Sequence, residues 1–167
     1  MTSHKTHLAV FLVALPLLTG MALGEVLPES IQAPGLAPFL TLHAEGVQIY
    51  QCKPGPGGKP TWTLREPIAS LMRDGVTVGR HFAGPTWELA DGGRVQGQVA
   101  GRAPGATSAD APWLKLDVTG REGGGLLGEA TVIQRVHTHG GALEGGCETP
   151  GALRGDAYSA DYVFLKR

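Results

Sequence analysis

Apolar and polar residues alternate along most of the chain after its first two dozen positions. The cleanest alternation lies in residues 113–119 and 158–165, and Val95, Gly97 and Val99 alternate with polar side chains in the same way. A period of two is typical of a strand with one buried face. Three strands are therefore predicted to turn one face toward a common core, through Leu114, Leu116, Val118, Val95, Val99, Tyr158 and Tyr162.

The other predicted strands are separated by residues that favour turns. Residues 40–43 and 47–52 both alternate, and Glu45-Gly46 between them is predicted to form a tight turn or a bulge. Asp74-Gly75 is a hairpin dipeptide, and Asp91-Gly92-Gly93 predicts a three-residue turn after the strand that contains Trp87. Residues 131–138, rich in β-branched side chains, are expected to form a further strand.

The remaining segments are predicted to be loops or short turns. Residues 53–60 and 101–112 are rich in Gly and Pro and are expected to be long loops. Residues 67–72 could form a helical turn or could equally be extended. The whole pattern predicts one all-β domain, an antiparallel sandwich or barrel of about seven to nine short strands.

Composition supports a folded domain and argues against one class of partner. The chain has 42% apolar and 17% charged residues and a net charge of −1, so it can bury a core despite its 26 Gly and 12 Pro. A nucleic-acid-binding protein needs clustered Lys and Arg, which a nearly neutral chain does not favour. We expect no nucleic-acid partner.

The first 24 residues have the layout of a secretory signal peptide. A polar start with Lys5 is followed by an apolar run at residues 8–18 and by Ala22 and Gly24 at the spacing of a cleavage site. The apolar run is far shorter than the roughly 20 residues that span a bilayer. We therefore expect a domain of residues 25–167 that is secreted or periplasmic, with no membrane span after cleavage. No Cys would stand at the new N-terminus, so no lipid anchor is expected.

Two cysteines, Cys52 and Cys147, remain in the expected mature chain. In an oxidising compartment an even pair indicates a disulfide, and only one pairing is possible. Their Cα atoms should then lie roughly 4.4–6.8 Å apart.

Five segments together resemble a family of secreted proteins of unknown activity, domain of unknown function 3455. The segments are LTLHAEGVQIYQC (40–52), GRHFAGPTWELADGGRVQG (79–97), APWLKL (111–116), IQRVHTHGG (133–141) and YSADYVF (158–164). The resemblance implies an exported all-β domain without assigning it an activity. The family usually has RVNT where this chain has RVHT, so His137 departs from the family pattern.

The densest group of polar and aromatic residues lies in residues 81–91. His81, Glu88 and Asp91 could supply acid–base chemistry for a secreted hydrolase, with Trp87 stacking on a flat substrate such as a sugar ring. The alternative interpretation is structural, with Trp87 in the core and Asp91 shaping its turn.

A binding surface is also predicted from this segment together with a second one. His81, Trp87, Glu88 and Asp91 would join Arg135 and His137 if their strands are neighbours. The competing interpretation buries Trp87 and pairs Arg135 with Glu88 as a structural ion pair. Whether the two segments meet is left open by the sequence.

Metal and cofactor sites have weaker support. His137 and His139 would project from one face of a strand together with Arg135, and they could bind Zn or Cu if His81 or His43 joined them. Otherwise these histidines lie on a solvated edge. Residues 123–128 match G-x-G-x-x-G, but a strand is predicted to follow where dinucleotide binding needs a helix. We therefore assign no cofactor and no metal.

The leading hypothesis is a non-enzymatic exported domain that binds an unidentified small molecule or protein through its loops. The hydrolase and the metal-binding protein are the alternatives. They can be separated by asking whether His81, Glu88, Arg135 and His137 converge on one cleft.

Overall fold

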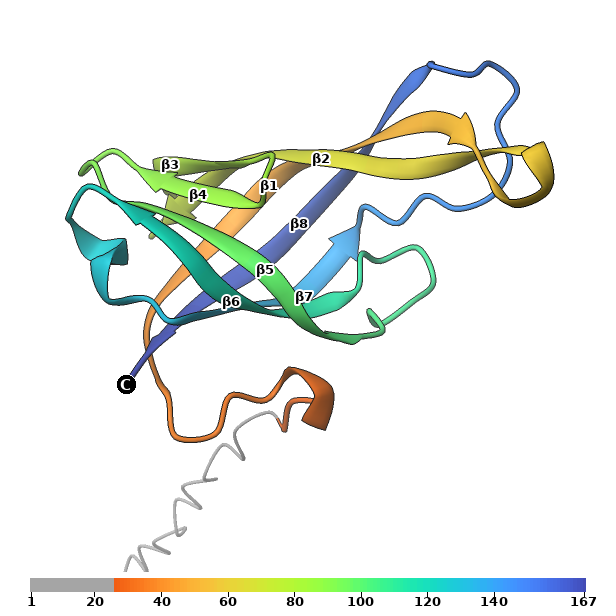
Figure 1. The fold of residues 1–167 in the computed structure, drawn as a ribbon. Coiled ribbons are helices and arrows are strands. Elements are labelled where there is room, and N and C mark those ends of the chain that lie inside the picture. The colour runs from red at the N-terminus through yellow and green to blue at the C-terminus, as the bar shows by residue number, and fades with distance from the viewer. Residues whose placement is uncertain (1–25) are drawn as a thin grey trace, which may run out of the picture.

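The computed structural model describes residues 26–167, so the predicted signal peptide lies outside the described residues. Eight antiparallel strands follow one another in chain order, and the first pairs with the last to close a barrel (Figure 1). The all-β prediction is confirmed, with a barrel rather than a sandwich. The strands are β1 (Ala37–Pro54), β2 (Pro60–Arg73), β3 (Val76–Phe82), β4 (Thr86–Leu89), β5 (Arg94–Ala103), β6 (Trp113–Glu122), β7 (Val132–Gly140) and β8 (Leu153–Lys166).

Several strands are longer than the sequence pattern predicts, and the prediction of a turn or bulge at Glu45-Gly46 is wrong. β1 runs for 18 residues through this dipeptide, and Gly46 pairs with Ala69 of β2. A Cβ atom at Gly46 would lie 2.1 Å from the carbonyl oxygen of Ile68. Gly46 therefore allows β2 to approach closely, which is the other common reason for a glycine inside a strand.

The remaining turns and loops match the predictions in part. Asp74 and Gly75 both have positive φ, 52° and 76°, as a two-residue hairpin turn requires. Residues 67–72 are extended within β2. The predicted loops at 53–60 and 101–112 are shorter than expected, because β1 extends to Pro54 and β5 to Ala103. A 3-10 turn, η2 (Pro56–Gly58), forms the tip of the β1–β2 hairpin.

The inward-facing residues are those that the alternation predicts. The buried members of the predicted set are Val95, Leu114, Leu116, Tyr158 and Tyr162. Val118 packs against the same core while partly exposed. Val99 is 36% exposed, although it too faces the interior, because it lines a pocket described below.

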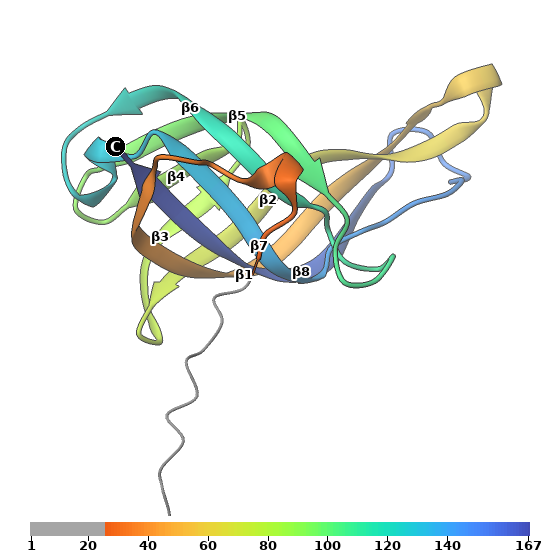
Figure 2. The same cartoon turned by 90° about the horizontal axis from the view of Figure 1, so that it is seen from below.

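The N-terminal segment covers part of the barrel's outer surface (Figure 2). Its 3-10 turn η1 (Glu29–Ile31) buries Ile31 against Ala103 and Val136, and the Gln134 side chain donates a hydrogen bond of 2.7 Å to the Ile31 carbonyl. β7 is consequently buried on both faces from Val132 to Val136.

One disulfide joins Cys52 of β1 to Cys147 in the β7–β8 connection, with the Cα atoms 5.9 Å apart. The predicted pairing and its distance are confirmed. Among residues 26–167, no helix is long and apolar enough to cross a membrane.

Candidate functional site

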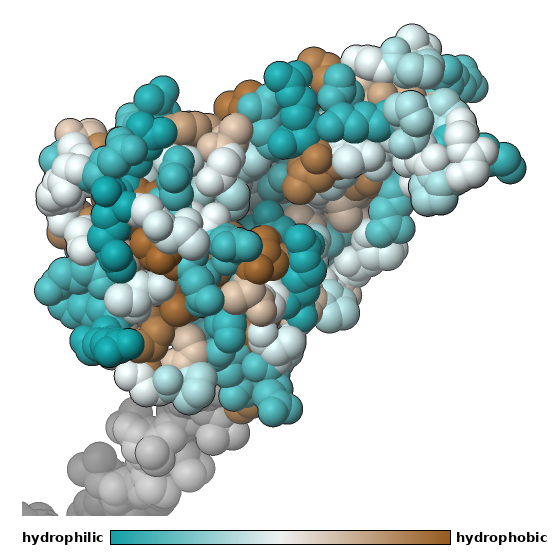
Figure 3. All heavy atoms as spheres, viewed as in Figure 1, coloured by the Kyte–Doolittle hydropathy of each residue, from teal (hydrophilic) through white to brown (hydrophobic). Residues whose placement is uncertain are grey.

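A pocket of about 450 Å³ enters the barrel at one end. This open end is where the β1–β2, β3–β4, β5–β6 and β7–β8 connections meet, and all eight strands contribute to the pocket lining. The space-filling view shows an indentation beside the projecting β1–β2 hairpin, with hydrophobic residues inside a hydrophilic margin (Figure 3). The volume lies in the range of small-molecule sites.

An aromatic cluster forms the inner wall of the pocket. Trp87 is fully buried, and the His81 ring stacks on it with centroids 4.5 Å apart and planes at 15°. Tyr162 meets Trp87 edge-on at 5.3 Å. The short β3–β4 hairpin produces this stack, because His81 and Trp87 are paired across it.

His81 is a neutral hydrogen-bond acceptor toward the pocket. Its Nδ1 lies 2.8 Å from the Thr86 carbonyl oxygen, which can only accept, so Nδ1 carries the hydrogen and Nε2 has a free lone pair. Burial lowers the pKa of His81 from 6.5 to about 3, against the raising effect of the Thr86 hydrogen bond, and the charge on Arg135 lowers it further.

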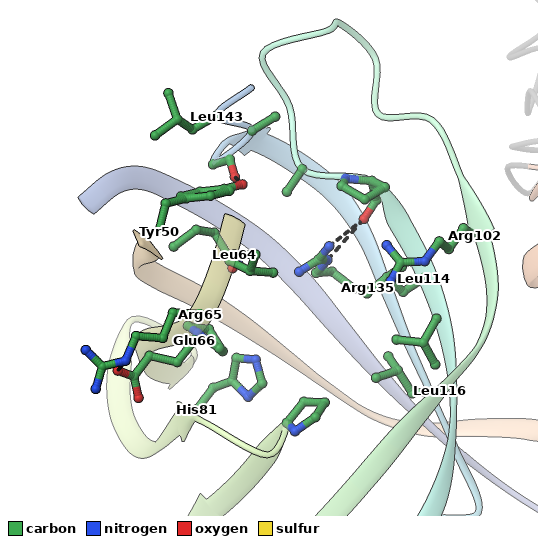
Figure 4. Close-up of a pocket in the computed structure, with 18 of the residues that line it drawn as sticks. Tyr50, Leu64, Arg65, Glu66, His81, Arg102, Leu114, Leu116, Arg135 and Leu143 are labelled. Carbon is green, nitrogen blue, oxygen red and sulfur yellow. Dashed lines mark hydrogen bonds and ion pairs between the residues drawn. The ribbon is translucent and has the colours of Figure 1, made fainter. Parts of the chain in front are cut away.

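Arg135 points into the same pocket from β7 (Figure 4). It is 6% exposed, and its Nε and Nη2 donate to the Pro112 carbonyl at 3.1 and 2.8 Å. No carboxylate among residues 26–167 lies within ion-pair distance of it. The competing interpretation is right that Trp87 is buried but wrong that Arg135 pairs with Glu88, because Glu88 lies on the outer face and pairs with Arg80 at 2.9 Å.

Two buried polar groups in the pocket lining lack partners within the described part of the chain. Gln48 is 1% exposed, and neither its amide oxygen nor its amide nitrogen has a hydrogen-bond partner. The indole N–H of Trp87 is also unpartnered. Leaving such groups unsatisfied costs about 1–3 kcal/mol each, so they call for an explanation.

Gln48 and Tyr50 were not predicted as site residues, although a signal was present. They alternate with Val47 and Ile49 and share a face with Cys52, whose side chain is buried in the disulfide. A glutamine on the inward face of a strand is unusual enough to have been a candidate.

Hydrogen bonds fix the loops around the pocket opening. The Tyr50 hydroxyl donates to the Gly141 carbonyl at 2.7 Å, and the Thr138 hydroxyl donates to the Ala111 carbonyl at 2.6 Å. The Asp110 carboxylate accepts from the Gly140 amide at 2.7 Å. The pocket walls are therefore held in place by the protein itself, as a pre-formed site requires.

The structure brings His81, Trp87 and Arg135 together but separates the other predicted site residues from them. Asp91 lies in the β4–β5 turn at the opposite end, where it accepts from the amides of Gly93 at 2.9 Å and Leu126 at 2.8 Å. These hydrogen bonds, the one from Leu126 first, lower the pKa of Asp91. With Glu88 on the outer face, the three proposed hydrolase residues do not meet.

His137 lies outside the barrel because of an irregularity that the alternation did not reveal. The β7–β8 register shifts between Val136 and His139, and His137 has a φ of 50°. Its Nδ1 lies 2.9 Å from Asp161, whose other carboxylate oxygen is 2.8 Å from His43. The prediction that Arg135 and His137 share a face is therefore wrong.

The described residues contain no group of three His, Cys, Asp or Glu side chains placed to hold a metal ion. The additional ligands that a site at His137 and His139 would need are thus not gathered there. His81 in particular is inside the barrel, stacked on Trp87.

The fold and the pocket together define a small eight-stranded β-barrel with an apolar core and a pocket, containing a few buried polar groups, that opens at one end. A family model described as protein of unknown function (DUF3455) matches residues 33–166, and the chain belongs to this family. No curated protein and no solved structure gives a significant match.

Proposed function

We propose that this protein is a non-enzymatic binding protein that takes up a small molecule at the open end of its barrel. The observation that carries the proposal is Gln48, a fully buried amide with no hydrogen-bond partner in the described chain, facing a cavity of about 450 Å³. A ligand with polar groups would satisfy it. Eight-stranded barrels of this size can hold one small ligand.

The lining supports a ligand that is partly apolar. Leu64, Leu114 and Val99 supply contact area, and the buried Trp87 behind them has an indole N–H without a partner in the described chain. A few fixed polar groups among apolar walls are typical of small-molecule sites.

We also propose that the protein acts outside the cytosol, as a secreted or periplasmic protein released by cleavage of residues 1–24. The Cys52–Cys147 disulfide supports this compartment, since such bonds persist where conditions are oxidising.

The binding proposal can be tested with N-phenyl-1-naphthylamine, a neutral probe that fluoresces in apolar sites. We expect one probe to bind per chain, and Leu114→Trp to abolish binding because the larger side chain fills the pocket. Leu153→Trp is the matched control, since Leu153 is 54% exposed and lies outside the pocket. Equal binding by Leu114→Trp and the wild type would reject the site.

A further inference from the structure

Arg135 supplies a positive charge inside the pocket that no carboxylate among residues 26–167 neutralises. The pocket is lined by three arginines and two glutamates. Arg65 and Glu66 pair with each other at 3.1 Å, and Arg102 and Glu144 are exposed at the opening. The inner charge therefore belongs to Arg135 alone.

Three titratable side chains of the described chain, His81, Tyr158 and Tyr162, interact electrostatically with Arg135, and each is neutral at physiological pH. Burial lowers the pKa of His81 to about 3 and raises the pKa of both Tyr158 and Tyr162. A buried guanidinium normally has an anionic partner, because removing an ion from water is costly. Here, within residues 26–167, the partners are a backbone carbonyl and nearby phenols.

The guanidinium of Arg135 keeps donors available for a ligand. Two of its five N–H groups, on Nε and Nη2, point to the Pro112 carbonyl. The others are on Nη1 and Nη2, along the edge that can bind a carboxylate through two parallel hydrogen bonds. Pro112 and the Tyr162 hydroxyl orient the side chain, and no carboxylate of the described residues occupies that edge.

The charge and the walls together define the ligand class. One buried positive charge matches a monoanion, whereas a phosphate dianion would leave a second charge uncompensated in a buried site. Leu64, Leu114 and Val99 suit an aromatic or aliphatic body behind the anionic group. Neutral donors at Gln48 and Trp87 add no further charge.

We infer that the pocket binds an organic carboxylate of low molecular weight, its carboxylate group paired with Arg135 and its apolar body enclosed by the barrel. This inference names the ligand class for the binding function proposed above and rests on it. It makes Arg135 a binding residue that selects for charge.

The test compares an acid with its neutral amide on the full, oxidised protein. Calorimetric titration with 2-naphthoate and 2-naphthamide should show the acid binding at least about tenfold more tightly. Arg135→Gln should remove this preference and leave the affinity for the amide within about twofold. Arg135→Lys keeps the charge but not the paired donors, so an intermediate loss is expected.

Arg102→Gln is the matched control, because it removes the same charge from an exposed position at the opening. Its effect on either probe should stay below about threefold. If Arg135→Gln fails to fold in a thermal melt, the preference of the wild type and the loss in Arg135→Lys decide the question.

Two failures can be told apart. Equal affinity for acid and amide, with binding of both blocked by Leu114→Trp, would overturn the carboxylate inference and leave the binding function standing. If N-phenyl-1-naphthylamine, 2-naphthoate, 2-naphthamide and decanoate all fail to bind at about 1 mM, the binding function is overturned as well.

Discussion

The two ends of the barrel are built from the same eight strands but are filled in opposite ways. At the closed end, Leu127 of the 3-10 turn η3 (Leu126–Glu129) is fully buried against the core, beside Phe164 and other apolar side chains. At the open end, the interior contains Gln48, His81 and Arg135 around a pocket. The closed end is filled by packed apolar side chains. The open end has a pocket in place of such packing, and buried polar groups line it.

The comparison separates residues that stabilise the fold from residues available for binding. Buried apolar side chains supply most of the folding free energy, and buried polar groups without partners reduce it. A polar, incompletely packed interior therefore needs support from elsewhere in the structure. Here the disulfide and the hydrogen bonds around the opening provide that support.

The largest effect is expected from breaking the disulfide at the open end. Cys52→Ala with Cys147→Ala should lower the free energy of unfolding by about 4–5 kcal/mol, because the bond closes a long loop. Urea denaturation of the variant and the oxidised wild type measures the difference. Probe binding should weaken too, since Cys147 anchors the connection that contributes Gly141 to the pocket. Unchanged stability would show that the open end is held without the bond.

Matched leucine truncations compare the packed and the hollow parts directly. Leu42→Ala in the core should cost about 3–5 kcal/mol, because it creates an enclosed cavity. Leu114→Ala should cost about 2 kcal/mol, since the lost volume joins an existing pocket and only the transfer free energy is lost. Denaturant titrations of both variants test this order, and a larger loss for Leu114→Ala would contradict it.

The pH dependence of stability should come partly from His81 at the open end. Its pKa is about 3 in the folded state and 6.5 in the unfolded state, so between these values only the unfolded chain binds the proton. The free energy of unfolding should therefore fall by about 1.4 kcal/mol per pH unit as the pH decreases through that window.

His81→Gln isolates this contribution from those of the other histidines. Between pH 6.5 and about pH 4.5, the wild type should lose about 2–3 kcal/mol more than the variant. Parallel denaturation curves at the two pH values provide the measurement. Equal losses would mean that folding does not lower the pKa of His81.

Most of the fold could be predicted from the sequence because the alternation that marks a strand is a local pattern. From that alternation Leu116 and Tyr162 were expected to face the core, and the export signal indicated that the two cysteines form a disulfide. Closure of the sheet depends on β1 pairing with β8, a contact between distant segments that no local pattern contains. The same limit applies to Gly46, whose role depends on the position of Ile68 in the neighbouring strand.

Only part of the candidate site could be predicted, because a local irregularity in β7 changes which face a side chain occupies. His81, Trp87 and Arg135 meet because their strands face one interior, as the alternation allowed. His137 was misplaced because a single positive φ in β7 reverses which face the side chain occupies. Such bulges depend on neighbouring strands and are not visible in the hydrophobic pattern.

The smallest effect is expected at the closed end, where it tests whether Asp91 belongs to the fold or to the site. Asp91→Asn should lower the free energy of unfolding by about 1 kcal/mol, because an amide cannot accept from both Gly93 and Leu126 as the carboxylate does. The contribution of Asp91 should be present at neutral pH and lost as the pH falls through its lowered pKa.

Asp117→Asn, the same change at an exposed strand position, should alter stability by less than about 0.5 kcal/mol. Both variants should bind N-phenyl-1-naphthylamine like the wild type, since neither residue lines the pocket. Weakened probe binding by Asp91→Asn with unchanged stability would show instead that the closed end takes part in binding.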